Sequence, residues 1–143
     1  ASDVYKRQIH MYAIYLVLLG IKIIEREIMA NQSINQFKKG ILPMLILQII
    51  SDEKDYGYNI VNRFNARCVA GMDIKEGTLY PILHRLEEDG AIASEWVMTS
   101  ENGKPKKFYK ITEEGKLLLE EQWNCWMQIE GMVRDFEKKH ISD

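Results

Sequence analysis

The chain is poor in the residues that hold together disulfide-rich or metal-dependent folds. Its 143 residues contain two cysteines, Cys68 and Cys125, which form no CxxC pair, and three histidines at no metal-ligand spacing from them. This spacing argues against a disulfide framework and against a zinc site. We therefore expect two buried thiols in the reducing cytoplasm, and no bound metal.

A surplus of positive charge is also lacking. The sequence holds 19 Lys and Arg against 21 Asp and Glu, for a formal net charge of -2. This balance excludes a protein that coats nucleic acid with its whole surface, whereas one local basic patch suffices for specific DNA binding. Apolar residues make up 46% of the chain, so it can bury the core of one domain plus an extension.

Catalytic motifs are missing as well. No combination of His, Cys and acid indicates an activated nucleophile, and no Walker-type or GxGxxG loop occurs. The adjacent carboxylates of Glu87 and Glu88 fall on the surface of a predicted helix. We expect a protein that is not an enzyme and that needs no cofactor.

Residues 1–28 differ in character from the rest. Lys6 and Arg7 precede the uncharged apolar run 11–21, which lacks the cleavage site of a signal peptide. The run is also shorter than the roughly 20 residues of a membrane span. Because residues 2–8 resemble a translated sequencing adapter, we expect 1–28 to be a non-native upstream segment, with Met29 as the natural start. A membrane anchor and a genuine apolar helix are the alternatives.

Three short helices are predicted over residues 40–50, 56–65 and 75–89. The first is apolar nearly all round, which indicates a buried helix with Pro43 in its first turn. The second places apolar side chains on one face. The third is amphipathic, ends at Gly90, and carries Pro81 past its first turn, which predicts a slight bend or a freed carbonyl near Gly77. Its apolar face consists of Leu79, Ile82, Leu83 and Leu86.

A β-hairpin and a long helix follow. Strands over residues 92–98 and 108–111 flank the turn signal Asn102-Gly103, and Thr112 caps a helix that runs to about residue 139. This order predicts a mostly α fold with a small β-hairpin (α+β). Residues 29–111 form a winged helix-turn-helix, and residues 112–143 form a C-terminal dimerisation helix.

The motifs of this region resemble those of the PadR-like family over roughly Phe37 to Phe136. The residues that carry the resemblance are Gly57-Tyr58 with Ile60, Gly77-Thr78-Leu79-Tyr80-Pro81 with Leu83, Arg85-Leu86-Glu87 with Gly90, and, after the hairpin, Tyr109, Ile111-Thr112 and Gly115. The single terminal helix is similar to that of the shorter PadR-like subgroup. The resemblance implies a transcriptional repressor that binds a palindromic operator as a homodimer and is released by a small molecule or another signal.

The third helix is the candidate recognition helix, with its N-terminal end in the major groove. Lys75 and Tyr80 can reach phosphates, and Thr78 can touch a base edge or a thymine methyl. His84 lies on the same face, and a solvated side chain is the alternative for Lys75 and His84. Tyr58 resembles a family position near the DNA backbone, and a place in the core is its alternative.

The hairpin concentrates positive charge. In the segment 101–110, Lys104, Lys106, Lys107 and Lys110 stand against one acid, Glu101. Such runs often mark solvated loops, but a run at the tip of a hairpin that follows a recognition helix favours phosphate binding. A winged helix that binds protein and not DNA is the alternative function.

The long helix carries a broad apolar stripe that one small domain cannot cover. We expect a two-fold dimer interface here, formed by Leu119, Ile129, Val133 and Phe136. In drug-responsive PadR-like proteins a tryptophan of this helix lines a pore at the dimer centre, and the matching residue is Trp126. We expect Trp123 and Trp126 to bind a small planar aromatic effector, with plain interface packing as the alternative.

Overall fold

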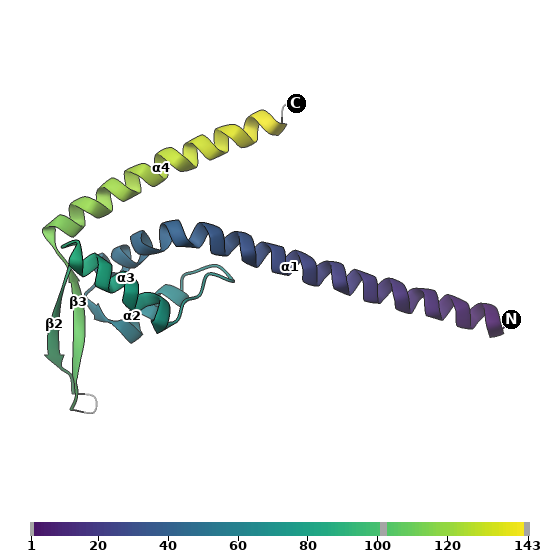
Figure 1. The fold of residues 1–143 in the computed structure, drawn as a ribbon, viewed down its shortest axis with the longest axis horizontal. Helices are drawn as coiled ribbons and strands as arrows, with labels where there is room; N and C mark the ends of the chain where they lie inside the picture. The colour runs from purple at the N-terminus through teal and green to yellow at the C-terminus, as the bar shows by residue number, and fades with distance from the viewer. Residues whose placement is uncertain (1, 101–102, 142–143) are drawn as a thin grey trace. The chain divides into compact units, whose positions relative to one another are not determined.

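The computed structural model describes residues 2–100 and 103–141 of the chain (Figure 1). Its elements are α1 (Ser2–Asp52), β1 (Asp55–Tyr56), α2 (Gly57–Asn65), α3 (Glu76–Glu88), β2 (Ile92–Met98), β3 (Pro105–Ile111) and α4 (Glu113–Ile141). The chain divides into two compact units, residues 1–38 and residues 39–143. The expected α+β fold is confirmed, and residues 39–111 of the predicted winged helix-turn-helix fall in one unit with the terminal helix.

The first unit consists of the N-terminal part of α1. Nearly all its described side chains are exposed, including the apolar ones between Met11 and Ile24. None of the helices in the described part of the chain combines the length and the apolarity that a membrane span requires.

The start of α1 corrects one prediction. Pro43 lies inside a helix that begins at Ser2, and not in the first turn of a helix that begins near Gly40. Because proline has no N–H, the carbonyl of Lys39 receives no helical hydrogen bond from residue 43. The second compact unit begins at Lys39. The residues before Pro43 include no other proline, so they continue the helix on its N-terminal side.

The core of the second unit lies between the end of α1, helices α2 and α3, and the inner face of the sheet. Leucine and isoleucine dominate it, because the helical spacing of these residues puts them on the inward faces. The largest fully buried side chains are Ile46, Leu47, Ile50, Ile60, Leu79, Leu83 and Ile92.

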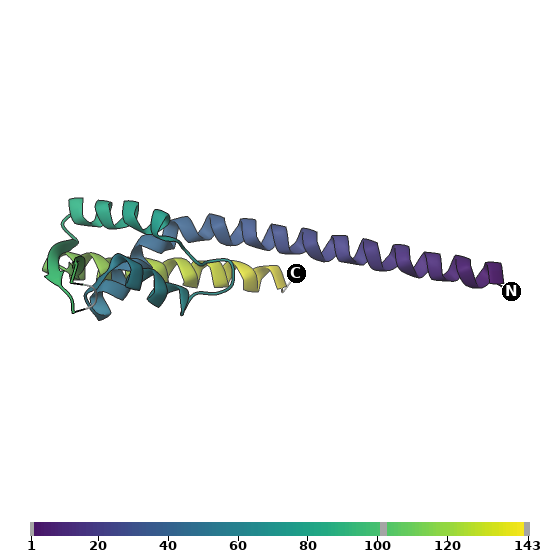
Figure 2. The same cartoon turned by 90° about the horizontal axis from the view of Figure 1, so that it is seen from below.

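The sheet has three antiparallel strands in the order β1-β3-β2, one strand more than predicted. The hairpin strand 92–98 is confirmed, and its partner begins at Pro105, three residues before the predicted start. The additional strand β1 has only two residues, which pair with Tyr109 and Phe108 of β3. Figure 2 shows the same elements in a second view.

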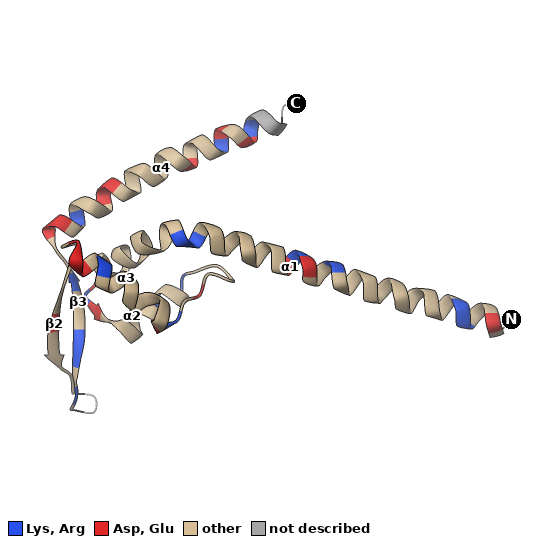
Figure 3. Cartoon of the chain, viewed as in Figure 1, with Lys and Arg blue, Asp and Glu red and all other residues tan. Residues whose placement is uncertain are grey.

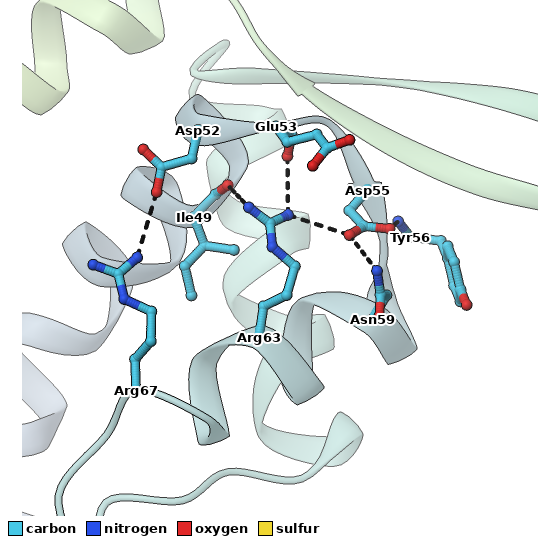
Figure 4. Close-up of polar contacts among 8 residues, drawn as sticks. All are labelled: Ile49, Asp52, Glu53, Asp55, Tyr56, Asn59, Arg63 and Arg67. Carbon is cyan, nitrogen blue, oxygen red and sulfur yellow. Dashed lines mark hydrogen bonds and ion pairs between the residues drawn. The ribbon is translucent and has the colours of Figure 1, made fainter.

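A buried ion pair holds the end of α1 against β1 and α2 (Figure 4). Arg63 donates to Asp55 at 3.2 Å, and also to the carbonyls of Ile49 at 2.9 Å and Glu53 at 3.1 Å. Asn59 donates to the same carboxylate at 2.6 Å. Asp55 is only 6% exposed, so these donors replace the water that its charge loses on folding.

The passage from α3 through the sheet to α4 is fixed by hydrogen bonds. Gly90 has φ +76°, and the N–H groups of Gly90 and Ala91 donate to the carbonyls of Glu87 and Leu86, which is a Schellman motif. Thr112 caps α4 as predicted, accepting from the N–H of Gly115 at 3.0 Å. Its hydroxyl donates to the carbonyl of Gly90 at 2.5 Å, which ties the two helix ends together.

Arg63 in the last turn of α2 and Arg67 just after this helix differ in burial and provide a matched test. Arg63→Ala leaves Asp55 buried without its cation, so we expect a loss of about 2 to 3 kcal/mol in the free energy of unfolding. Arg67→Ala removes only an exposed ion pair to Asp52 at 3.4 Å, and we expect a loss of at most about 1 kcal/mol. Urea unfolding at one protein concentration measures both. Equal losses for the two variants would contradict the role of the buried pair.

Candidate DNA-binding surface

The N-terminal end of α3 is held in place by a side chain that the sequence pattern did not single out. Asn65, the last residue of α2, donates to the carbonyl of Ile74 at 2.9 Å and accepts from its N–H at 2.9 Å. Ile74 itself is buried. Because both backbone groups of Ile74 bind one side chain, the loop between α2 and α3 has a fixed shape, and α3 begins at a defined position two residues later.

The outer face of α3 carries the predicted contact residues. Lys75, Thr78, Tyr80 and His84 are all exposed, as DNA contact requires. His84 forms an ion pair with Glu88 at 3.2 Å when its imidazole is protonated. The first turn also holds Glu76, whose carboxylate repels phosphate. Positive charge near the start of this helix therefore comes from Lys75.

Tyr80 connects the recognition helix to the start of α2. A Cβ added at Gly57 would lie 2.9 Å from the hydroxyl oxygen of Tyr80, so the tyrosine ring rests against the glycine backbone. Tyr58, next to this glycine, is 58% exposed, which excludes the alternative place in the core. The glycine, Tyr58 and Tyr80 thus form one aromatic surface at the junction of the two helices.

The hairpin presents its lysines along β3 (Figure 3). In the register of the sheet, Lys106 lies opposite Val97 and Lys107 lies opposite Trp96. Because neighbouring residues of a strand alternate, the two lysine side chains point to opposite faces of the hairpin. The ammonium of Lys106 lies 4.1 Å from the centre of the Tyr56 ring. Lys104 is exposed before the strand, while Glu101 and Asn102 lie outside the described residues.

The acid of β2 does not cancel this charge. Glu95 pairs with Lys54 at 3.0 Å, and the hydrogen bond and charge of Lys54 hold the pKa of the Glu95 carboxyl below its usual value. On the inner face, burial raises the pKa of the Tyr109 phenol, with the Glu87 carboxylate adding to the shift. The glutamate is thus ionised and already paired at neutral pH, and the tyrosine remains uncharged.

A hollow between the hairpin and the helices brings part of the predicted set together. Four of the predicted DNA contacts line it, together with Tyr56, Gly57, Pro105, Tyr109 and an exposed tryptophan, Trp96, to which the sequence pattern assigned no role. Lys75, Thr78, His84 and Lys104 do not line it. The four predicted contacts in the hollow are Tyr58, Tyr80, Lys106 and Lys107.

The sequence model of the transcriptional regulator PadR-like family matches residues 46–121, more than half of the chain. The chain belongs to the PadR-like family. Its members are transcriptional regulators and not enzymes, in agreement with the prediction from the missing catalytic motifs. The match begins in the last part of α1 and ends in the first turns of α4, so it covers α2, α3 and all three strands.

Several transcriptional regulators are similar to this chain in sequence or in fold. The transcriptional regulator Rv3488 of Mycobacterium tuberculosis is 30% identical over 86 residues, which cover 60% of this chain and 76% of that protein. A PadR family regulator from Eggerthella lenta has a TM-score of 0.69 at 31% identity, covering 79% of this chain and 96% of that one. A PadR-like regulator from Bacillus cereus has a TM-score of 0.63 at 33% identity, covering 71% and 95%.

Helix α4 divides the predicted interface residues into two groups. Ile129, Val133 and Phe136 are exposed. Leu119 is only 6% exposed and packs in the core of its own chain, which corrects its assignment to a dimer interface. The reason is that the first turns of α4 lie against the winged helix, where a Cβ added at Gly115 would overlap the carbonyl oxygen of Ala91.

The two tryptophans of α4 line different hollows. The indole N–H of Trp123 donates to Gln48 of α1 at 2.8 Å, and its ring borders a hollow beside Phe64 and Met72. Trp126 borders a second hollow with Met44, Leu118, Glu121 and Ile129.

The cysteines also depart from the sequence prediction. Cys125 is exposed and Cys68 is half-buried, so neither is the fully buried thiol that we expected. The thiol of Cys68 donates to the carbonyl of Asn65 at 3.5 Å, in the loop after α2. Cys125 lies on the part of α4 that the winged helix leaves uncovered, next to Trp126.

Replacing Lys104, Lys106 and Lys107 together by alanine tests the hairpin as a phosphate-binding element. We expect weaker binding to all duplexes alike, and a salt dependence of log affinity that flattens by about 0.9 for each phosphate that the hairpin no longer neutralises. Fluorescence anisotropy at several salt concentrations measures the slope. Lys116→Ala on α4, whose lysine is paired with Glu113, is the control and leaves the slope unchanged. If the triple variant keeps the wild-type salt slope, the hairpin does not contact the DNA phosphates.

Proposed function

We propose that the chain is a sequence-specific DNA-binding repressor that acts in the cytoplasm and binds a palindromic operator as a homodimer. The observation that supports it most is the hollow that joins α3 to the hairpin, because it gathers two tyrosines and two lysines beside the exposed start of the recognition helix. Lysines and tyrosine hydroxyls suit phosphate oxygens, which fix a protein on the duplex. The polar face of α3 then reaches the base edges in the major groove.

Thr78 is the residue of this face best suited to reading sequence. Its side chain is exposed on the first turn of α3, and a threonine contacts a thymine methyl or a base edge. Lys75 at the N-cap and Tyr80 further along the helix lie on either side of Thr78 in the sequence, and both can bind phosphates of the DNA backbone. His84 lies one turn beyond Tyr80, with its Nε2 3.2 Å from a carboxylate oxygen of Glu88, and is a further candidate for a phosphate contact.

A comparison of two duplexes tests this function. We expect the full chain to bind the DNA upstream of its own gene at least about a thousandfold more tightly than mixed-sequence DNA. Thr78→Ala should lower only the affinity for the upstream duplex, by about tenfold. Gln128→Ala on exposed α4 is the control. Equal affinity for both duplexes would contradict sequence-specific binding, and no binding to either would favour a protein-binding winged helix.

The homodimer is supported by the uncovered part of α4. Ile129, Met132, Val133 and Phe136 follow helical spacing and are each about half exposed or more, at 49%, 54%, 56% and 69%. An apolar stripe of this length on one helix is typical of an interface between copies. Two-fold pairing through α4 sets two recognition helices at a fixed spacing, as a palindromic operator requires.

Charges placed on this stripe should separate the subunits. We expect Ile129→Glu with Val133→Glu to give monomers with weak DNA binding, because a carboxylate buried in an apolar interface lacks a partner. Asn124→Glu with Gln128→Glu adds the same charge to α4 outside the stripe and should leave the dimer intact. Light scattering at micromolar concentration reports the mass. A wild-type monomer would contradict the proposal.

A small planar effector is the third part of the proposed function. Trp126 is half-buried beside Met44 and Ile129, which offer apolar walls, and Glu121 lines the same hollow. An indole face and a carboxylate together suit a cationic aromatic compound. Trp123 borders the neighbouring hollow with its ring, while its N–H is bound to Gln48.

Tryptophan fluorescence titrated with planar cationic dyes tests the effector site. We expect quenching at micromolar dye that Trp126→Ala abolishes while the dimer persists. Trp123→Phe, which alters the other hollow, should retain the quenching. Loss of the dimer in Trp126→Ala, or the absence of quenching by any dye, would contradict the effector site and show that Trp126 only packs in the interface.

A further inference from the structure

One large apolar side chain of the winged helix is not part of its core. Trp96 lies in the middle of β2 and is 70% exposed. It is the only one of the three tryptophans that lies outside α4. Single exposed apolar residues are common on protein surfaces, so its exposure alone does not assign it a role.

The register of the sheet shows which way this side chain points. Alternate pairs of the hairpin share a face: Ile92 with Ile111 and Ser94 with Tyr109 come first, and Trp96 with Lys107 comes next. The first two pairs face the helices, and Ile92, Ile111 and Tyr109 are buried. Trp96 therefore continues the inner face of the sheet toward the hairpin turn, where the hairpin runs past α2 and α3 (Figure 1).

The surroundings of Trp96 indicate what covers it. It lines the hollow that also holds Tyr58, Tyr80 and Lys107. Its cross-strand neighbour is a lysine, and the one acid of β2, Glu95, points to the other face and is paired with Lys54. An apolar ring bordered by lysine and tyrosine hydroxyls complements a surface in which apolar sugars alternate with phosphates. The ammonium of Lys107 lies 5.6 Å from the centre of the Tyr109 ring, which supplies no negative charge. The backbone of duplex DNA offers both the apolar sugar and the anion, whereas an apolar peptide offers no anion to the lysine.

We propose that Trp96 packs its indole against the deoxyribose of the operator backbone while Lys107 binds an adjacent phosphate. This inference rests on the proposed DNA-binding function. Cross-strand neighbours have Cβ atoms about 5 Å apart, so the two side chains act on one short stretch of backbone. Trp96 is then a positioning residue, which fixes the place of the hairpin on the duplex and reads no base.

Substitution of Trp96 distinguishes this apolar contact from a charge contact. We expect Trp96→Ala to weaken binding by about five- to tenfold on both the upstream duplex and mixed-sequence DNA, because the indole no longer buries apolar area against the sugars. The salt slope should stay at the wild-type value, since no charge is removed. Trp96→Phe should restore most of the affinity. Val69→Ala removes another exposed apolar side chain, on the loop after α2, and should have no effect.

Fluorine NMR of the full chain labelled with 5-fluorotryptophan provides a second readout. The three resonances are assigned by Trp→Phe substitutions, and we expect mixed-sequence DNA to shift the Trp96 resonance more than that of Trp123. An unchanged Trp96 resonance at saturating DNA, or equal affinity of Trp96→Ala and wild type, would overturn the inference while the proposed function stands. A wild-type protein that binds neither duplex would overturn both.

Discussion

The ion pair between Arg63 and Asp55 is the interaction that joins the separate parts of the winged helix. The guanidinium of Arg63 reaches two carbonyls at the end of α1 and the carboxylate of Asp55. Asp55 begins β1, and β1 pairs with β3 of the hairpin. One arginine on α2 thus fixes where the first helix ends and where the sheet lies beside it. The hollow between hairpin and helices exists because these elements are held at this separation.

A second junction transmits the geometry of the winged helix to α4. The Schellman motif at Gly90, the Thr112 hydroxyl and the close approach of Gly115 to Ala91 hold the end of α3 and the start of α4 together. Because α4 carries the exposed apolar stripe, this junction sets the direction of that stripe relative to α3. A movement at a hollow beside α4 therefore has a short route to α3, which is how the proposed effector would act.

The sequence allowed the local elements to be predicted and left the contacts between distant segments open. The bounds of β2, the cap at Thr112 and the turn at Gly90 follow from alternation, capping chemistry and glycine, which act over a few residues. The strand β1 could not be predicted, because its two residues become a strand only by pairing with β3. The hydrogen bonds of Asn65 to Ile74 were missed for the same reason.

The candidate site was predicted in part. Exposed residues of α3 and lysines of the hairpin could be named from composition and order, but the pattern could not show which of them share a surface. Lys106 and Lys107 line the hollow while Lys104 does not, and Leu119 turns into the core while Ile129 stays exposed. Trp96 was given no role, because its position past the helices becomes visible only when the hairpin is folded against them.

Hydroxyl-radical footprinting of the full chain on the DNA upstream of its own gene tests the central claim most directly. A two-fold dimer that presents two recognition helices should protect two segments related by symmetry, with centres about one helical turn, or roughly 34 Å, apart. A single protected segment without symmetry, or uniform weak protection along the duplex, would contradict a dimer that recognises a palindromic operator.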